Sequence, residues 1–440
     1  MVGAKGHGNR TDGTGERAEC YCTATKEVGN EQSTGLFVPL QSCKEILALL
    51  SIKRMFEQDF AETQDLNLTM SQEDLMFMNI TVGGIHKAGN GHYEIPLPLR
   101  DENVRLPCNR KLAETRLKQL KRRLENDPKY KQDYVTLMEK MIADGHAEKA
   151  PNQYERAWYI PHHGVYHPKK SEKLLVVFDC SAEFQGHSLN RHLLQGPHLT
   201  NTLIGVLCRF RQEPVAFACD IEGMFHQVHV NEEHCDLLRF LWWDQGDTTK
   251  EPTKYRMTVH LFGATSSPGC ANLALRTAAD DSKDDLGVEA ASFMKENFYV
   301  DDGLRSVPTV PEATKLIKNA TEMCMRGGIK LHKFTSNSKE VVESIPVESR
   351  AKEIKEIDLN CDLLPPEHVL GVEWNIENDV FKFRITLKDK PLTRRGILST
   401  VSSIYDLLGF AAPFLFRGKR IVQPLCKENL DWDDAIPDEL

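Results

Sequence analysis

Two adjacent carboxylates, Asp301 and Asp302, follow the apolar run FYV at 298–300 and precede Gly303. The run consists of β-forming residues, so it predicts a buried strand that ends at the aspartate pair. Neighbouring carboxylates repel each other, and such a pair at the end of a buried strand is costly unless a cation lies beside it. The pair is therefore a candidate cation site, although Asp-Asp-Gly is more often a solvated turn.

A third carboxylate, Asp220, closes the apolar run VAFAC at 215–219. If the two runs are neighbouring strands, their three carboxylates form an all-oxygen site suited to a hard divalent cation such as Mg²⁺. Two such ions, about 3.5–4 Å apart, activate a hydroxyl group and stabilise a leaving oxygen in an in-line displacement. We therefore expect Asp220, Asp301 and Asp302 to cluster and to bind two Mg²⁺ ions, with Mn²⁺ as a substitute.

The surrounding pattern predicts the elements that position these residues. Apolar spacings of 4-3-4 predict two helices, and from Trp158 onward short β-forming runs separated by turns predict strands. The predicted helices cover 113–124, 130–141, a segment starting near 267, 311–326 and the C-terminal stretch from 393, whose apolar body is ILSTVSSIYDLLGF; the predicted strands cover 158–166, 174–178, 215–219, 238–243, 255–261 and a hairpin within 369–384.

Composition limits the class of protein. The chain has 440 residues, of which 40% are hydrophobic and 27% charged, which is typical of a globular protein with two or three domains. Its apolar runs are too short to cross a bilayer, and its first residues lack the apolar core of a secretory signal. The twelve cysteines are mostly isolated, as in reduced intracellular proteins. Residues 1–35 are Gly/Thr/Glu-rich and are predicted to be disordered.

Charge is distributed unevenly. The formal net charge is −9, yet residues 101–131 and 381–420 are each rich in Lys and Arg. A basic segment is usually a solvated face. Two basic segments on either side of an acidic centre would also form a channel for nucleic acid around bound metal ions.

Several phrases together resemble one known family. They are YVDD (299–302), DIEGMF (220–225), LFGATSSP (261–268), WYIPHHGVYHP (158–168), VVFDCSA (176–182), SLN (188–190), LLQGP (193–197) and SSIYDLLGFAAPF (402–414). In this order they resemble the reverse transcriptase region of BEL/Pao-type LTR retrotransposon polyproteins. The resemblance covers roughly residues 75–440.

The resemblance implies an α+β fold, namely a right-hand polymerase with fingers, an antiparallel palm sheet and a helical thumb. A partly disordered N-terminal extension and connector would occupy residues 1–100. The fingers-like region would follow at 101–210, the palm with the catalytic aspartates and a primer-grip hairpin at 211–385, and the thumb-like helices at 386–440.

The resemblance also implies a function. An RNA-directed DNA polymerase transfers a nucleotide from a dNTP to a primer 3′-OH by two-metal chemistry, on an RNA or DNA template. Other parts of the polyprotein would be partners, and the location would be the cytoplasm, in a virus-like particle, with access to the nucleus. The alternative is a catalytically impaired relic that keeps the fold and binds nucleic acid. A third hypothesis is a metal-dependent phosphatase or nuclease that uses the same carboxylates.

Residue roles follow from the matching positions. Asp220 and Asp301 would ligate both metal ions, Asp302 would be the third acidic group, and the Ile221 carbonyl would add an oxygen ligand. Lys333 would donate a proton to the pyrophosphate that leaves.

The substrate-binding positions carry over in the same way. Phe225 would be the steric gate against a ribose 2′-OH, and Phe262 and Gly263 would allow template and nucleotide to approach the backbone. Tyr299 would touch the primer end, and the turn at Leu370-Gly371 would belong to the primer grip.

The chain departs from the family at Leu175, where the family has an arginine that contacts the incoming triphosphate. Lys173 and the neighbouring lysines are the nearest substitutes, and they are flexible point charges rather than a planar fork, so reduced activity is expected. The sequence contains no protease Asp-Thr/Ser-Gly signature and no integrase zinc pattern. We expect no RNase H domain either, because the chain stops soon after the thumb-like segment.

Overall fold

A four-stranded antiparallel sheet carries the predicted carboxylates. Its strand order is β10 (Phe298–Tyr299), β11 (Asp302–Val307), β6 (Val215–Ile221) and β12 (Leu331–Ser336). Alternate residues of β6 enter two different hydrophobic cores, Phe217 and Cys219 on one face and Ala216 and Ala218 on the other. The strand is apolar throughout because both of its faces are covered.

These elements come from a computed structural model that describes residues 70–152, 156–167, 170–355, 359, 363–382, 390–404, 406, 408–427 and 431–436. The predicted disorder of residues 1–35 lies outside the described residues. In the described part of the chain, no helix is both long and apolar enough to span a membrane. The cysteines described there are free thiols.

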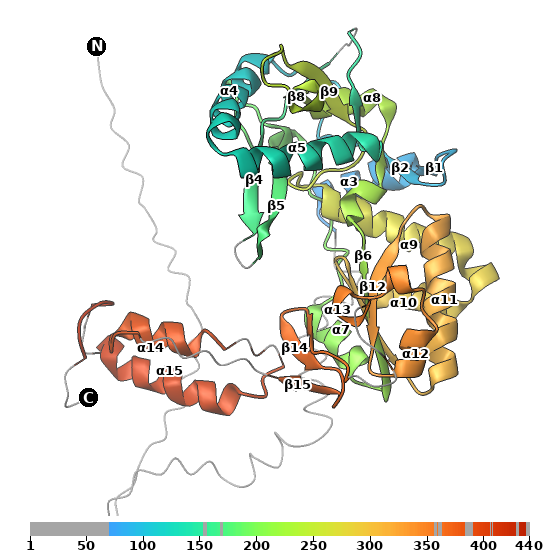
Figure 1. Cartoon of the computed structure of the whole chain (residues 1–440), viewed down its shortest axis with the longest axis vertical. Helices are drawn as coiled ribbons and strands as arrows, with labels where there is room; N and C mark the ends of the chain where they lie inside the picture. Colours follow the sequence, from blue (N-terminus) through green and yellow to red (C-terminus); the bar gives the residue numbers. More distant parts are fainter. Residues whose placement is uncertain are drawn as a thin grey trace, which may run out of the picture. The chain divides into compact units, whose positions relative to one another are not determined.

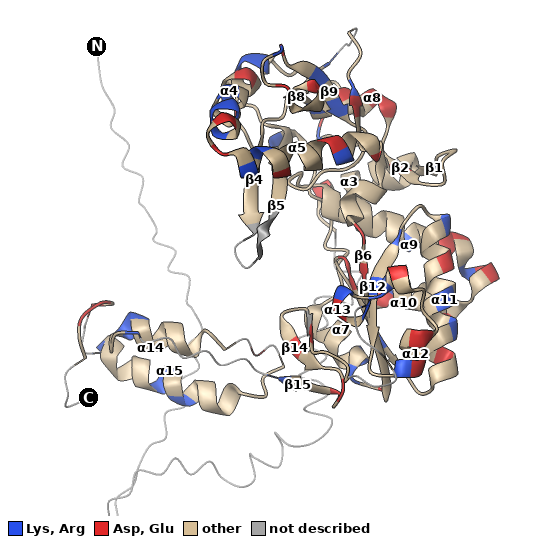
Figure 2. Cartoon of the chain, in the orientation of Figure 1, with Lys and Arg blue, Asp and Glu red and all other residues tan. Residues whose placement is uncertain are grey.

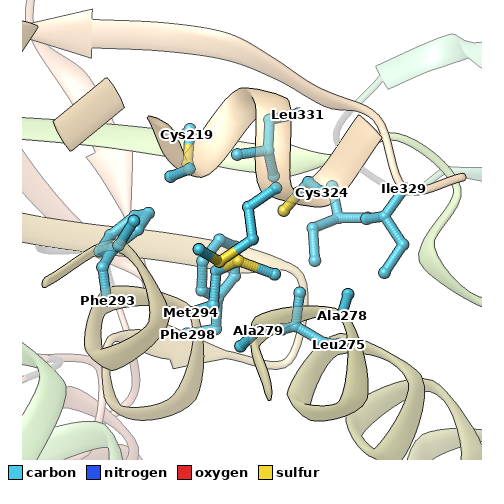
Figure 3. Close-up of a cluster of buried hydrophobic side chains, with 14 of the residues drawn as sticks. Cys219, Leu275, Ala278, Ala279, Phe293, Met294, Phe298, Cys324, Ile329 and Leu331 are labelled. Atoms are coloured by element: carbon cyan, nitrogen blue, oxygen red, sulfur yellow. The ribbon is translucent and has the colours of Figure 1, made fainter. Parts of the chain in front are cut away.

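Three helices cover one face of the sheet: α9 (Ser267–Leu286), α10 (Val288–Glu296) and α11 (Val310–Arg326) (Figure 1). Pro268 lies in the first turn of α9, where its missing N–H costs nothing, and the Thr309 side chain caps α11 by accepting from the Glu312 N–H. Figure 3 shows the core between helices and sheet, where Cys219 and Leu331 from the strands face Met294 and Phe298.

The other face of the sheet packs against α7 (Leu203–Phe210) and a small antiparallel sheet, β13 (Glu367–Val369), β14 (Val372–Asn375) and β15 (Val380–Lys382). Phe210 and Trp374 are fully buried here, with ring centroids 4.9 Å apart. Arg211 fixes the β14–β15 turn by donating to the Asp379 carbonyl oxygen over 2.7 Å. Asp220 and Asp302 belong to this face, because they continue the alternation of Ala218 and Leu304.

A further core joins α4 (Arg110–Asn126), α5 (Pro128–Ala143), the hairpin β4 (His162–His167)–β5 (Lys170–Phe178) and a sheet of order β3 (Ala147–Lys149), β9 (Thr253–Met257), β8 (Arg239–Trp242). The two predicted 4-3-4 stripes form helices, and their apolar residues face this core. In α5 the third fully buried position is Met138, whereas the predicted Leu137 and Met141 are partly buried.

The remaining elements are short strands and helices, together with two C-terminal helices that contact each other. They are α3 (Gln72–Gly84), β1 (His86–Lys87), β2 (Tyr93–Ile95), α6 (Leu189–His192), η1 (Met224–Gln227), β7 (His229–Val230), α8 (Glu232–Cys235), η2 (Asp236–Leu238), η3 (Asp244–Gly246), α12 (Lys339–Glu343), η4 (Val347–Ser349), α13 (Lys352–Lys355), α14 (Arg394–Val401) and α15 (Ala412–Lys427).

Three predicted elements differ from the structure. The strand expected from Trp158 begins only at His162, after Pro161, which has no N–H to donate. The strand expected over 255–261 ends at Met257. The apolar body at 397–410 is not one helix, because α14 ends at Val401 and the Asp406 carboxylate accepts from the N–H groups of Phe410 and Ala411 just before α15.

Candidate metal centre

Backbone pairing brings the three predicted carboxylates together. Asp220 in β6 lies directly opposite Asp302 in β11, and the Asp301 carbonyl oxygen accepts from the Ile221 N–H over 2.9 Å. Directly opposed residues of an antiparallel pair put their side chains on one face, with Cβ atoms about 4.5–5.5 Å apart. Three negative charges therefore share the end of this sheet.

The aspartate pair lies in a hairpin turn rather than at the end of a single strand, which corrects the predicted strand end. Strand β10 stops at Tyr299, Val300 has a left-handed φ of +57°, and β11 begins at Asp302. A β-branched residue rarely adopts this φ, so the turn stores backbone strain. Gly303 is required next, because a Cβ there would lie 2.5 Å from the Phe298 ring.

Burial and electrostatic repulsion raise the pKa values of two of the three carboxyl groups. Burial and the charge of Asp220 raise the pKa of Asp301 above its usual range. Burial, together with the charges of Asp301 and Asp220, raises the pKa of Asp302 to about 7. Both groups therefore favour a neighbouring positive charge.

Asp220 has two side-chain partners of its own. Its Oδ1 lies 3.0 Å from His332 Nε2, and its Oδ2 accepts from Lys333 Nζ over 2.6 Å. Burial alone would raise the pKa of Asp220, but these hydrogen bonds and the Lys333 charge hold it below its usual range. His332, which sequence reasoning missed, lies opposite Asp220 in β12. Its place directly before Lys333, which the sequence singles out, was the available signal.

The donor set fits a hard divalent cation in its chemistry, since all three groups are carboxylates. The arrangement of the side chains does not yet match this chemistry. Among the described residues, no group of three or more His, Cys, Asp or Glu side chains is arranged so that it could hold a metal ion. Both oxygens of Asp220 already have protein partners, the His332 ring at Oδ1 and the Lys333 ammonium at Oδ2. A metal ion at this centre would therefore require Asp220 to change partners.

An aromatic pair follows β6 in sequence. Phe225 in η1 is half-buried, and its ring centroid lies 4.5 Å from that of Phe262, which is 46% exposed. Gly263 has φ +107°, and a Cβ there would lie 2.7 Å from the Phe178 carbonyl oxygen, so only glycine fits.

Asn190, which belongs to the SLN motif at 188–190, binds the loop that contains Gly263 and Thr265. Its Nδ2 donates to the Gly263 carbonyl oxygen over 3.0 Å, and its Oδ1 accepts from the Thr265 N–H over 3.0 Å. The sequence alone did not indicate that Asn190 binds this loop. An asparagine that donates to one backbone group of a loop and accepts from another constrains the loop's backbone.

Of the other predicted positions, Ile221 and Tyr299 adjoin the carboxylates, because Tyr299 pairs with Asp302, whereas Lys173 and Leu175 lie in the β4–β5 hairpin. Ile221 is 1% exposed beside Asp220, and Tyr299 is half-buried against the core of Phe210 and Trp374. Lys173 lies in β5, but its side chain is outside the described part of the structure. Leu175 is exposed on the hairpin, opposite Val165.

The predicted Leu370-Gly371 turn joins β13 to β14. Both residues have positive φ, 49° and 84°, as a two-residue type I′ hairpin requires. Glycine adopts a positive φ readily. Leucine rarely does so, and at position 370 the pairing of β13 with β14 imposes it.

Both basic segments contain partnered side chains, and in the second one Arg395 pairs with Asp433 at 2.7 Å (Figure 2 colours Lys and Arg blue). In α4, Arg116 pairs with Asp179 at 3.2 Å and Arg123 stacks on the Tyr130 ring at 4.0 Å. In α15, Arg417, Lys419 and Arg420 are exposed. Part of the segment at 381–420, including Arg384 and Lys388, lies outside the described residues.

Comparison with known proteins gives a family match and 462 matching chains among solved structures, of which two are described here. Residues 393–440 match the family model of the Pao retrotransposon-like RNaseH-like domain. A solved foamy viral protease-reverse transcriptase dRH in complex with ds DNA is 14% identical, with 93% of this chain and 60% of that chain covered and a TM-score of 0.50. A prototype foamy virus protease-reverse transcriptase CSH mutant is 16% identical, with 89% and 43% covered and a TM-score of 0.41, too low to support an argument. No curated protein matches.

The family match supports a retroelement polyprotein as the source of the chain, and the first neighbour shows a shared mixed helix-and-sheet fold. The chain spans only 60% of that neighbour's length.

Two predictions are corrected by the family match. The expected absence of an RNase H domain is wrong, because the matched family at 393–440 is RNaseH-like. The assignment of the chain as an RNA-directed DNA polymerase, and its alternative of an impaired polymerase relic, are overturned by the same finding. Apolar periodicity locates helices in a sequence but does not identify the domain to which they belong.

Proposed function

We propose that this chain is a nucleic-acid-binding segment of a retroelement polyprotein, and that Asp220, Asp301 and Asp302 form a divalent-metal centre for phosphoryl transfer. The observation that carries the proposal is the register of β6 and β11, which sets Asp220 opposite Asp302. The raised pKa values of Asp301 and Asp302 support it, because a nearby cation would relieve their repulsion.

The chain's own residues would divide the work. The three carboxylates would hold the ions and stay ionised around them, and the buried neighbours Cys219 and Ile221 keep the ends of the strands rigid. Bound Mg²⁺ or Mn²⁺ would supply charge stabilisation at a phosphate and an activated oxygen nucleophile. The exposed Phe262 offers a flat apolar surface of the kind on which a base stacks.

Nucleic acid is the partner that the charges favour. The first structural neighbour was solved with ds DNA. In this chain, exposed basic residues of α15 would contact phosphates, so affinity should fall with salt. The finer expectations, a right-hand layout of fingers, palm and thumb and a dNTP as a bound partner, belong to this proposal and rest on the sequence.

The test uses end-labelled strands in an RNA–DNA hybrid and in double-stranded DNA, with Mg²⁺ or Mn²⁺ and nucleoside triphosphates. Shorter and longer products are both scored, so phosphoryl transfer to water and to a strand end are both detected. We expect metal-dependent products that Asp301→Asn reduces by about 100-fold or more while nucleic-acid binding persists.

Glu222→Gln is the matched control, because it removes a nearby carboxylate whose partner is Lys330 at 2.7 Å. Its activity should stay close to that of the wild type. Equal loss in both variants, or products without added metal, would contradict the assignment of the centre. Binding with no product of either kind would leave a nucleic-acid-binding segment only.

A further inference from the structure

Strand β12 departs from regular geometry beside Asp220. Its pairing with β6 shifts register between His332 and Thr335, and Lys333 has a left-handed φ of +52°. In a regular strand, consecutive residues point to opposite faces, so His332 and Lys333 would not share a target. The irregular segment lets both side chains reach the two oxygens of Asp220.

This local strain has an electrostatic consequence. The Lys333 ammonium lies 2.6 Å from Asp220 Oδ2, and Asp220 lies opposite Asp302, so the positive charge stands beside the carboxylates of the centre. The Lys333 side chain is 55% exposed, so it contacts Asp220 from the solvent side and has room to leave. Because the Lys333 ammonium is held by Asp220 but is not buried, another cation can replace it.

Resting on the proposed metal centre, we propose that Lys333 is an internal competitor for the cation site: its ammonium holds Asp220 Oδ2, and a divalent ion takes that oxygen only by expelling Lys333 into solvent. The competition explains why chemically suitable carboxylates are not yet disposed to hold a metal ion. When a metal ion binds, its charge replaces that of Lys333 beside Asp220, so the Asp220 carboxylate always has a cation next to it. Lys333 is thus a positioning residue that sets the threshold for loading.

The test measures Mn²⁺ affinity from the free-ion electron paramagnetic resonance signal, in the wild type and in Lys333→Met. We expect Lys333→Met to bind Mn²⁺ roughly 2- to 10-fold more tightly, since it removes one partly exposed ion pair. Lys330→Met is the control, because Lys330 pairs with Glu222 at 2.7 Å and its loss changes the net charge equally. Its affinity should change clearly less than that of Lys333→Met.

A second readout follows Lys333 itself. Acylation by a brief pulse of an amine-reactive ester, quantified by mass spectrometry, should increase at Lys333 when Mn²⁺ is added and remain constant at Lys330. An amine held against a carboxylate is less available than one free in solvent.

The outcomes separate the two proposals. Equal Mn²⁺ affinity in the wild type, Lys333→Met and Lys330→Met would overturn the competition and leave the metal centre standing. Acylation of Lys333 that does not respond to bound Mn²⁺ would also overturn the competition. No Mn²⁺ binding by either the wild type or Lys333→Met would overturn the centre, and the inference with it.

Discussion

Asp302 is the carboxyl group on which burial and like charge act together most strongly. Its folded-state pKa is raised to about 7 from an ordinary value of 3.8. Between these two pH values the folded state binds the proton that the unfolded state has lost. The contribution of Asp302 to stability is therefore complete below pH 3.8 and is lost as the pH rises through 7.

Asp302→Asn should accordingly stabilise the metal-free protein at pH 8, by about 1–3 kcal/mol, because asparagine keeps the shape without the charge. Urea unfolding in EDTA measures this, and the gain should shrink towards zero as the pH approaches 4. Glu289→Gln removes an exposed carboxylate and should change stability by less than about 0.5 kcal/mol. A destabilised Asp302→Asn at pH 8 would show that Asp302 is not repelled by its neighbours.

Among the elements, the loop after Leu261 depends on one side chain from another segment. Asn190 satisfies a carbonyl and an N–H of the loop at Gly263 and Thr265. Asn190→Ala should therefore destabilise the protein by about 1–3 kcal/mol, since it leaves both backbone groups without this partner. Chemical denaturation gives the size of the effect, and amide exchange at residues 261–266 should accelerate.

Asn190→Asp provides the internal comparison. Aspartate still accepts from the Thr265 N–H but no longer donates to the Gly263 carbonyl, so exchange should quicken less than in Asn190→Ala. If alanine leaves both stability and exchange unchanged, Asn190 does not hold the loop.

At the scale of the whole molecule, we expect histidines that burial keeps neutral to control how the free energy of unfolding changes at acid pH. Burial lowers the pKa values of His162, His226, His229 and His260 to about 4. The unfolded chain takes up these protons near pH 6.5, so the stability they contribute is present above that pH and is lost as the pH falls towards 4.

His260→Gln tests this directly, because His260 is fully buried and its Nε2 lies 3.3 Å from the Ile95 carbonyl oxygen. The free energy of unfolding should fall less steeply between pH 6.5 and 4.5 in this variant, whatever its stability at pH 8. His86→Gln, at an exposed histidine, should retain the wild-type slope. A His260→Gln slope equal to that of the wild type would assign the acid response to other groups.

Sequence patterns anticipated the local elements better than the connections between them. Apolar spacing located α4 and α5, and the run ending at Asp220 located β6, whereas the aspartate pair lies at a turn between β10 and β11 rather than at a strand end. The left-handed residues Val300 and Lys333 could not be anticipated, because only tertiary packing imposes such a φ on these residue types. The partnership of His332 with Asp220 required the strand order, which local pattern does not give.

The shared divalent centre is tested most directly by the anomalous scattering of Mn²⁺ in crystals of the protein. We predict a peak at the end of β6, with carboxylate oxygens of Asp220, Asp301 and Asp302 within about 2–2.5 Å of bound ions and Lys333 turned into solvent. The absence of a peak there, with Lys333 still on Asp220 at a saturating Mn²⁺ concentration, would contradict the proposed centre.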